Sequence, residues 1–244
     1  MRDFLRARLR QGTATIRYPD PTLRLPDRFR GRPTPRGGQP AADLGRCLFS
    51  PEESVSQGGG LLFTTDHRLA ASSRDGLSVE SAAAPRIEAL EGRMRSLFGR
   101  SLRLRSVSAG SCSGCEAELV ALSNVVFDLA RFGVQFVASP RHADGLLVTG
   151  AVNVNMRDAL LRTYAAVPEP RMVIALGACA IGGGPFRGSP EVADGVSELL
   201  PVDLYVPGCP PHPLTVLDGL LRLLGRVAGE APEAHPAGAP VTRP

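Results

Sequence analysis

The chain has 244 residues, a net charge of +4 and a hydrophobic fraction of 43%, which is enough apolar material for a globular core. Aromatic residues make up only 5%, which argues against a surface that stacks single-stranded nucleic acid. No apolar run approaches the roughly 20 residues needed to cross a bilayer, and the first residues lack the apolar core of an export signal. We therefore expect a cytoplasmic protein with reduced thiols.

The first 50 residues are dense in proline and arginine. Residues 1–36 carry ten Arg against three Asp, and Pro19, Pro21, Pro26 and Pro33 follow one another closely. Because proline cannot continue a helix or a central strand, we expect an extended segment here. A basic arm of this kind fits nucleic acid, anionic lipid or an acidic partner protein, and its lack of interleaved aromatic residues makes the partner protein at least as fitting as the other two.

Three stretches of this front part carry a resemblance: "TIRYPDP…LPDRFRGRP", "RCLFSPEE" and "LLFTTDHRLAASSRDGL". Together they resemble the ferredoxin-type, two-cluster subunit of complex I and of formate hydrogenlyase. That family carries a C-x-x-C-x-x-C-x-x-x-C-P run where this chain has only Cys47, and one thiol cannot hold a [4Fe–4S] cluster. The resemblance implies that residues 1–84 form a ferredoxin-like module without clusters, which serves as a scaffold for a neighbouring subunit.

Residues 85–98 predict an amphipathic helix. Ile87, Leu90, Met94 and Leu97 fall on one face, and Pro85 stands at the first helical position. We favour a helix in the core or at a subunit interface. A helix on a membrane surface is the alternative, because arginines surround it.

From residue 100 onward, strand-like and helix-like segments alternate. Near-continuous apolar strands between helices are typical of a parallel sheet covered on both faces. The pattern predicts an α/β fold, a flavodoxin-like doubly wound parallel sheet, within residues 85–228, followed by a disordered tail over 229–244. The expected strands are 102–108, 134–138, 145–150, 172–176 and 202–206, and the expected helices are 116–132, 155–166, 190–200 and 213–227.

Four cysteines stand directly after predicted strands. Cys112 and Cys115 form a C-x-x-C pair, Cys179 lies in Gly-Ala-Cys-Ala, and Cys209 lies in Pro-Gly-Cys-Pro. Ligands of an open α/β sheet bind outside the carboxyl ends of its strands, so these loops should meet at one edge. Thiols grouped in loops of a reduced protein are typical metal ligands. The four cysteines therefore predict one metal site.

The loops around these cysteines favour a cluster over a single ion. Their glycines let the backbone approach a bulky inorganic core and aim N–H groups at its sulfurs. Cys115 opens a predicted helix, whose N-terminal dipole favours the thiolate. A structural zinc site also takes four cysteines, usually as two C-x-x-C pairs, and remains the alternative. A phosphate loop is a weak alternative, because "GACAIGGG" lacks both the dinucleotide and the P-loop fingerprint.

Residues 97–228 carry the more specific resemblance. "LFGRSLRLRSVSAGSCSGCEAEL", "RHADGLLVTGAVNVNM", "PEPRMVIALGACAIGGGPF" and "LYVPGCPPHP" resemble the family of the 20-kDa subunit of complex I. Quinone-reducing members carry two adjacent cysteines at the first motif. This chain has a C-x-x-C pair there, as do the small subunits of membrane-bound group 4 [NiFe] hydrogenases, including formate hydrogenlyase. The resemblance implies that Cys112, Cys115, Cys179 and Cys209 ligate the [4Fe–4S] cluster nearest the large-subunit active site.

Two acidic residues and one histidine accompany the cysteines. In the family an acidic residue at this place faces the large subunit, so the resemblance implies a proton path through Glu116 or Glu118. The simpler interpretation is that carboxylates in a first helical turn favour the helix dipole. His212 follows Cys209 closely and either tunes the cluster by hydrogen bonding or serves as a polar interface residue.

The resemblance implies an electron-transfer subunit without a catalytic site of its own. Its partners would be a hydrogenase or complex I-type large subunit, a ferredoxin-type iron–sulfur subunit and membrane subunits, but no nucleic acid. It would lie on the inner face of the cell membrane, held there by those partners. The alternatives are a quinone-linked, complex I-like subunit without hydrogenase activity and a scaffold that has no cluster or is stabilised by zinc.

Overall fold

The computed structural model describes residues 2–20, 22–35, 42–50, 61–79, 87–88 and 101–227. The helix expected over 85–98, apart from Ile87 and Glu88, and the tail expected over 229–244 lie outside the described residues. Within them, no helix is long and apolar enough to span a membrane.

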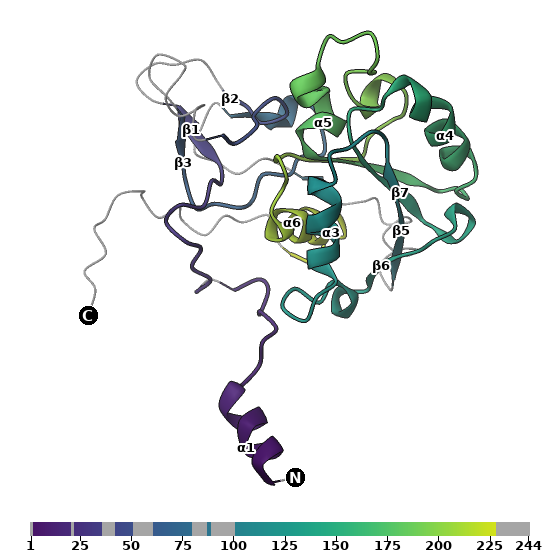
Figure 1. Cartoon of the computed structure of the whole chain (residues 1–244). Coiled ribbons are helices and arrows are strands. Elements are labelled where there is room, and N and C mark those ends of the chain that lie inside the picture. The colour runs from purple at the N-terminus through teal and green to yellow at the C-terminus, as the bar shows by residue number, and fades with distance from the viewer. Residues whose placement is uncertain are drawn as a thin grey trace.

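Residues 101–227 fold around a five-stranded sheet in which every neighbouring pair of strands is parallel (Figure 1). The spatial order is β6-β5-β7-β8-β9, which in chain order is the 2-1-3-4-5 arrangement of flavodoxin-like sheets. The strand order reverses between β5 and β7. The predicted α/β fold class is confirmed. The strands are β5 (Leu102–Ser108), β6 (Val134–Phe136), β7 (Gly145–Thr149), β8 (Met172–Leu176) and β9 (Leu204–Val206).

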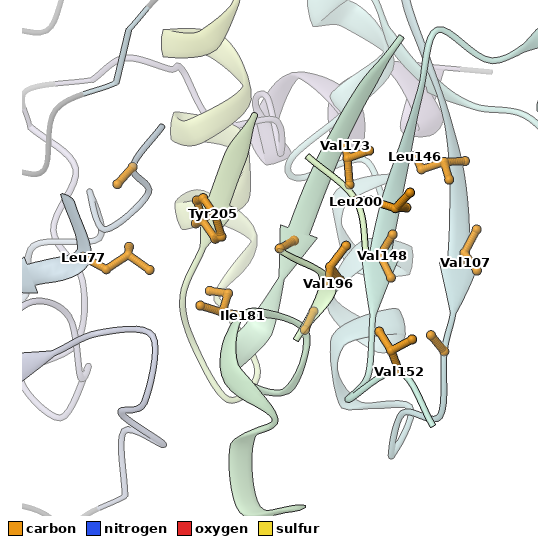
Figure 2. Packing of buried hydrophobic residues seen from close by; sticks show 14 of the residues in the cluster. Leu77, Val107, Leu146, Val148, Val152, Val173, Ile181, Val196, Leu200 and Tyr205 are labelled. Atoms are coloured by element: carbon orange, nitrogen blue, oxygen red, sulfur yellow. The ribbon is translucent and has the colours of Figure 1, made fainter. Parts of the chain in front are cut away.

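Helices cover both faces of this sheet. On one face α3 (Gly114–Leu122) and α6 (Pro213–Leu223) pack together over Leu104, Leu147 and Ile174. On the other face Leu160 of α4 (Val154–Ala165) packs in the cluster that Figure 2 shows. The strand residues divide between the two clusters because successive side chains of a strand point to opposite faces.

The front part of the chain packs against the β9 edge. Residue Ala71 forms an antiparallel bridge with Tyr205, and each backbone N–H donates to the other carbonyl. Leu77, Tyr205 and Ile181 lie in the same buried cluster (Figure 2). The front part thus covers a sheet edge that would otherwise expose unpaired backbone groups. Its strands are β1 (Pro33–Pro35) paired with β3 (Leu61–Phe63), and β2 (Ala42–Asp43) paired with β4 (Ser78–Val79), both antiparallel.

The expectation of a wholly extended segment over the first 50 residues is wrong at its start. Residues Arg2–Gln11 form helix α1. The prolines begin only at Pro19, and the arginine, leucine and alanine of α1 are good helix formers. Gly12, with φ of +65°, ends the helix in the left-handed conformation that glycine adopts readily.

Two predicted helices are also wrong in extent. Helix α3 ends at Leu122 rather than near residue 132, because the Asn124 side chain accepts hydrogen bonds from the N–H groups of Val126 and Phe127 and closes a turn. Over 190–200 only a short 3₁₀ turn forms, because Asp194 (φ +51°) and Gly195 (φ +124°) leave the helical region. Within the described residues the remaining short helices are α5 (Gly177–Gly182) and the 3₁₀ turns Asp75–Leu77, Leu129–Phe132, Pro140–His142, Gly184–Phe186 and Val196–Glu198.

Candidate metal centre

Three loops at the carboxyl edge of the sheet carry the four predicted cysteines. Cys112 and Cys115 follow β5, Cys179 lies in α5 directly after β8, and Cys209 follows β9. Parallel strands end at the same edge of a sheet, so their loops lie side by side there. The C-x-x-C pair stands at the reversal of strand order between β5 and β7, the usual ligand position of such a sheet.

The loops approach one another closely at Gly177. A Cβ atom added to Gly177 would come within 2.6 Å of Cys115 Sγ and 3.5 Å of the Gly208 carbonyl oxygen. Gly177 also has φ of +88°, in the left-handed region that L side chains rarely adopt. The neighbouring Ala178 N–H donates to the Gly208 carbonyl at 2.9 Å. The β8 loop therefore packs against both the C-x-x-C thiol and the Cys209 loop.

The four thiols influence one another electrostatically. Burial raises the pKa of Cys115 to about 12, and Glu116 and the other three cysteines act in the same direction. Burial raises the pKa of Cys179 to about 11, again helped by Cys209 and Cys112. At Cys115 the effect of burial on the pKa therefore outweighs that of the helix dipole, which was expected to favour the thiolate. A cation among the thiols would reverse this balance, since a coordinated thiol loses its proton.

The number of these thiols bears on which metal groups the site could hold. Among the residues described, no three Cys, His, Asp or Glu side chains are placed to hold one metal ion. Zinc brings four thiolates to about 2.3 Å from a single centre. A [4Fe–4S] cluster takes one thiolate on each of four irons and so holds its ligands further apart. The four cysteines supply the number of thiolate ligands that either group takes.

Glu116 ties the C-x-x-C loop to the end of β7. Its Oε1 atom accepts hydrogen bonds from Ser111 Oγ at 2.5 Å and Thr149 Oγ1 at 2.6 Å. Burial raises the pKa of Glu116, but these hydrogen bonds outweigh it and hold the pKa below its ordinary value. Its Oε2 atom is buried and has no hydrogen-bond partner among the described residues. Glu116 is therefore an ionised group at the strand-order reversal.

Glu118 has a different environment. It lines a cavity of about 270 Å³ together with Cys209, His212 and the front residues Arg28 and Phe29. Burial raises the pKa of Glu118 above its ordinary value. Of the two carboxylates, Glu118 therefore takes up a proton more readily.

His212 is occupied in capping α6. Its Nδ1 atom accepts the N–H of Leu214 at 3.2 Å, and its ring meets Phe29 and Phe127 edge to face. Burial and the charge of His67 lower its pKa, so the imidazole is neutral. The geometry thus assigns the Nδ1 atom a structural hydrogen bond.

Cys47, the remaining cysteine, belongs to the apolar core of the front part. It is 6% exposed and lies in one cluster with Leu44, Phe49 and Leu77. Its Sγ atom accepts the N–H of Phe49 at 3.4 Å. Cys47 therefore packs as a small apolar residue.

A buried polar network beside α6 is absent from the sequence-based expectations. The Tyr18 hydroxyl donates to Asp218 at 2.8 Å and lies 3.0 Å from His67 Nε2, while Asp218 forms an ion pair with Arg222. Burial and Asp218 raise the pKa of Tyr18, so its hydroxyl stays protonated. The sequence signal for this network is an Asp and an Arg four residues apart on an otherwise apolar helix, which predicts a buried ion pair there.

Comparison with known proteins places the chain among redox subunits. The family model for the 20-kDa subunit of NADH ubiquinone oxidoreductase matches residues 112–223. The probable membrane-bound hydrogenase subunit mbhJ of Pyrococcus furiosus is 41% identical over 151 residues, which are 60% of this chain and 90% of that protein.

Two further relatives are named as subunits of a formate hydrogenlyase and of an NADH-quinone oxidoreductase. Formate hydrogenlyase subunit 7 of Escherichia coli is 40% identical over 151 residues, 62% of this chain and 59% of that protein. A subunit of the NADH-quinone oxidoreductase of Desulfovibrio desulfuricans is 40% identical over 171 residues, 70% of this chain and 91% of that protein. Residues 112–223 contain strands β6 to β9 and the four cysteines, and the chain belongs to the family of the 20-kDa subunit of NADH ubiquinone oxidoreductase.

Proposed function

We propose that this chain is the electron-transfer subunit of a membrane-bound hydrogenase or formate hydrogenlyase-like complex and carries one [4Fe–4S] cluster. The observation that supports it most is the meeting of three cysteine loops at the carboxyl edge of the sheet, at the reversal of strand order. Cys112, Cys115, Cys179 and Cys209 would hold the cluster. When bound, a cluster of this kind accepts and donates single electrons at a potential that its surroundings set.

The surrounding residues would adjust that potential. Cys115 and Cys179 are half-buried and Cys112 and Cys209 are exposed, so solvent access is limited at two of the four ligands, which matters for the potential of an iron–sulfur group. The ionised Glu116 beside Cys115 places a fixed negative charge there and disfavours the gain of an electron. In this proposal bond chemistry belongs to a partner large subunit, as the family resemblance implies.

The hydrogenase branch rests on the C-x-x-C pair and on similarity to relatives named as hydrogenase and formate hydrogenlyase subunits. In this proposal a large subunit covers the cluster edge, a ferredoxin-type subunit exchanges electrons, and membrane subunits hold the assembly on the inner face of the membrane. The front part, residues 1–84, acts as a ferredoxin-like scaffold without clusters. Glu118 carries protons at the large-subunit interface, and normal turnover of Glu118→Gln with its cluster intact would remove that role.

A quinone-linked subunit of a complex I-like enzyme is the second candidate. It is favoured by the similarity to the NADH-quinone oxidoreductase relative, which extends over 91% of that protein. The two candidates differ in the large subunit. Nickel in the purified complex, held by cysteine pairs of the large subunit, would support the hydrogenase branch, and its lack would support the quinone-linked one.

The test is anaerobic purification followed by counting of iron, sulfide, zinc and nickel, with visible and EPR spectra. We expect about four irons and about four sulfides per chain and a reducible cluster signal. Cys179→Ala should lose most of the iron. Cys47→Ala is the matched control, because Cys47 packs in the apolar core, and it should keep the iron. One zinc without iron, or no metal even when partner subunits are co-expressed, would contradict the proposal and favour a scaffold.

A further inference from the structure

Helix α1 is an exposed helix that carries both large apolar and basic side chains. Phe4, Leu5 and Leu9 are 72%, 54% and 82% exposed. No residue of α1 is buried against any described part of the chain. Figure 1 shows the helix at the end of an extended segment, away from the sheet. Exposure of apolar side chains on this scale marks a surface that another body covers.

The two kinds of side chain are arranged around the helix in a regular way. Leu5 and Leu9, four residues apart, lie on one face. At 3.6 residues per turn, Arg2 and Arg6 flank that face on one side and Arg8 flanks it on the other. Asp3, the one acidic residue of α1, lies roughly 140° away from the leucine face. The leucine face is therefore bordered by positive charge and faces away from the carboxylate.

The attachment of α1 to the body is short and defined. The Thr15 hydroxyl donates to the Val125 carbonyl at 2.8 Å, and the Ile16 N–H donates to the Val126 carbonyl at 2.9 Å. Both carbonyls belong to the turn that follows α3, whereas Cys115 lies at the other end of that helix. Substitutions in α1 therefore leave the cysteine loops untouched.

We propose that α1 lies on an anionic lipid surface, with Leu5 and Leu9 in the boundary layer between headgroups and acyl chains. Arg2, Arg6 and Arg8 would reach the phosphates from the flanks of the leucine face. A helix that borders an apolar stripe with basic side chains and turns its polar side to water is built to lie in such an interface. Nucleic acid would use the arginines but leave Leu5 and Leu9 exposed, so lipid accounts for more of the helix. Phe4 lies about 120° from the leucine face and stays outside the boundary layer. The inference does not depend on a bound cluster.

The charge of α1 sets the expected strength of the interaction. Each basic residue near an anionic membrane strengthens binding by about fivefold. Salt screens this attraction beyond a distance of roughly 10 Å from the membrane surface. Helix α1 carries four arginines and one aspartate, and the aspartate lies on the side away from the leucine face. Binding should therefore require both anionic lipid and the leucine face, and it should weaken as salt is raised.

The experiment is co-sedimentation of the full-length protein with vesicles of phosphatidylcholine alone or mixed with phosphatidylglycerol. We expect binding to the mixed vesicles. Leu5→Gln with Leu9→Gln should weaken it by about tenfold or more. Replacing Arg2, Arg6, Arg8 and Arg10 by glutamine should weaken it by about a hundredfold or more. Ala7→Gln, on the face opposite the leucines, is the matched control and should bind like the parent protein.

A lysine variant separates lipid from an acidic protein partner. Replacing the four arginines by lysine keeps the charge but removes the forked guanidinium that pairs with carboxylates. Vesicle binding should survive this change. The proposal is overturned if neutral and anionic vesicles bind equally, if the leucine substitutions have no effect, or if α1 binds only partner subunits or nucleic acid. Metal content is measured in the same samples, so a failure of lipid binding is distinguished from a failure of the proposed electron transfer.

Discussion

At the scale of single residues, the packing of the cysteine loops depends on Gly177, which has no side chain. Gly177 stands directly between Cys115 and the Gly208 carbonyl, in a conformation with φ of +88°. Any other residue there meets the Cys115 sulfur and also strains the backbone. The backbone of the β8 loop therefore limits where the Cys115 thiol can lie.

Gly177→Ala is predicted to remove metal binding and to lower the free energy of unfolding by about 1–3 kcal/mol. The added Cβ would lie 2.6 Å from Cys115 Sγ, so the thiol must move, and alanine at this φ carries strain. Iron per chain and urea unfolding measure the two effects.

Gly188→Ala is the matched control for this prediction. Gly188 also has a positive φ, +77°, but a Cβ there meets nothing within 4 Å. It shares the backbone strain without the clash, so it should lose some stability and keep its iron. Equal iron in the two variants would show that Gly177 does not position Cys115.

At the scale of elements, the β1–β3 pair is held by a buried ion cluster. Asp66, just after β3, pairs with Arg32, just before β1, and with Arg68 at 2.7 Å. The three side chains are 12%, 4% and 15% exposed. Burial raises the pKa of Asp66, but Arg68 and Arg32 outweigh it and hold the pKa below its ordinary value. The charged aspartate therefore stabilises the folded pair.

Asp66→Asn is predicted to destabilise the protein by about 3–5 kcal/mol near neutral pH, because it leaves the Arg32 charge buried without its counterion. The contribution of Asp66 is present above the pKa of the unfolded chain, about 3.9, and is lost as pH falls through the lower pKa of the folded state. The difference between variant and parent should therefore shrink in acid. Urea unfolding at a series of pH values measures it.

Asp27→Asn serves as the control, since Asp27 is exposed. It should unfold like the parent protein at every pH. A difference for Asp66→Asn that stays constant down to strongly acidic pH would refute the assigned role of the ionised carboxylate.

At the scale of the whole molecule, the front part and the sheet share one core. Ala71 pairs with Tyr205 at the β9 edge, and Leu77 lies in the same buried cluster as Ile181 (Figure 2). The Tyr18 hydroxyl adds a partly buried hydrogen bond to Asp218 of α6. The front part is therefore a covering layer of the α/β fold, and we expect the two to unfold together.

Leu77→Ala is predicted to cost about 2–5 kcal/mol and to lower the stability of the sheet as well as of the front part. Leu77 is fully buried, so its truncation leaves a cavity at the shared core. Hydrogen exchange should rise both at the Tyr205 amide and in β8. Leu62→Ala, at a side chain that is 40% exposed, should change little. Faster exchange at Tyr205 alone would mean that the front part unfolds separately.

Much of the sheet could be predicted because its signals are local. The apolar run of β8 is buried on both faces, as its composition indicates, and the alternation of strands and helices indicated the fold class. The ends of helices were less predictable. The Asn124 turn stops α3 and the left-handed Asp194 and Gly195 prevent a helix over 190–200, and these backbone conformations leave little trace in periodicity.

The order of strands and helices and the positions of the cysteines after strands could be read from the sequence, because side-chain periodicity and residue chemistry are properties of short stretches. Which distant residues meet became visible only in the folded chain. It placed Tyr18 against Asp218, 200 positions away, assigned His212 Nδ1 to capping α6, and buried Cys47 in the core. Such contacts depend on how strands order and helices pack, which is a property of the whole chain.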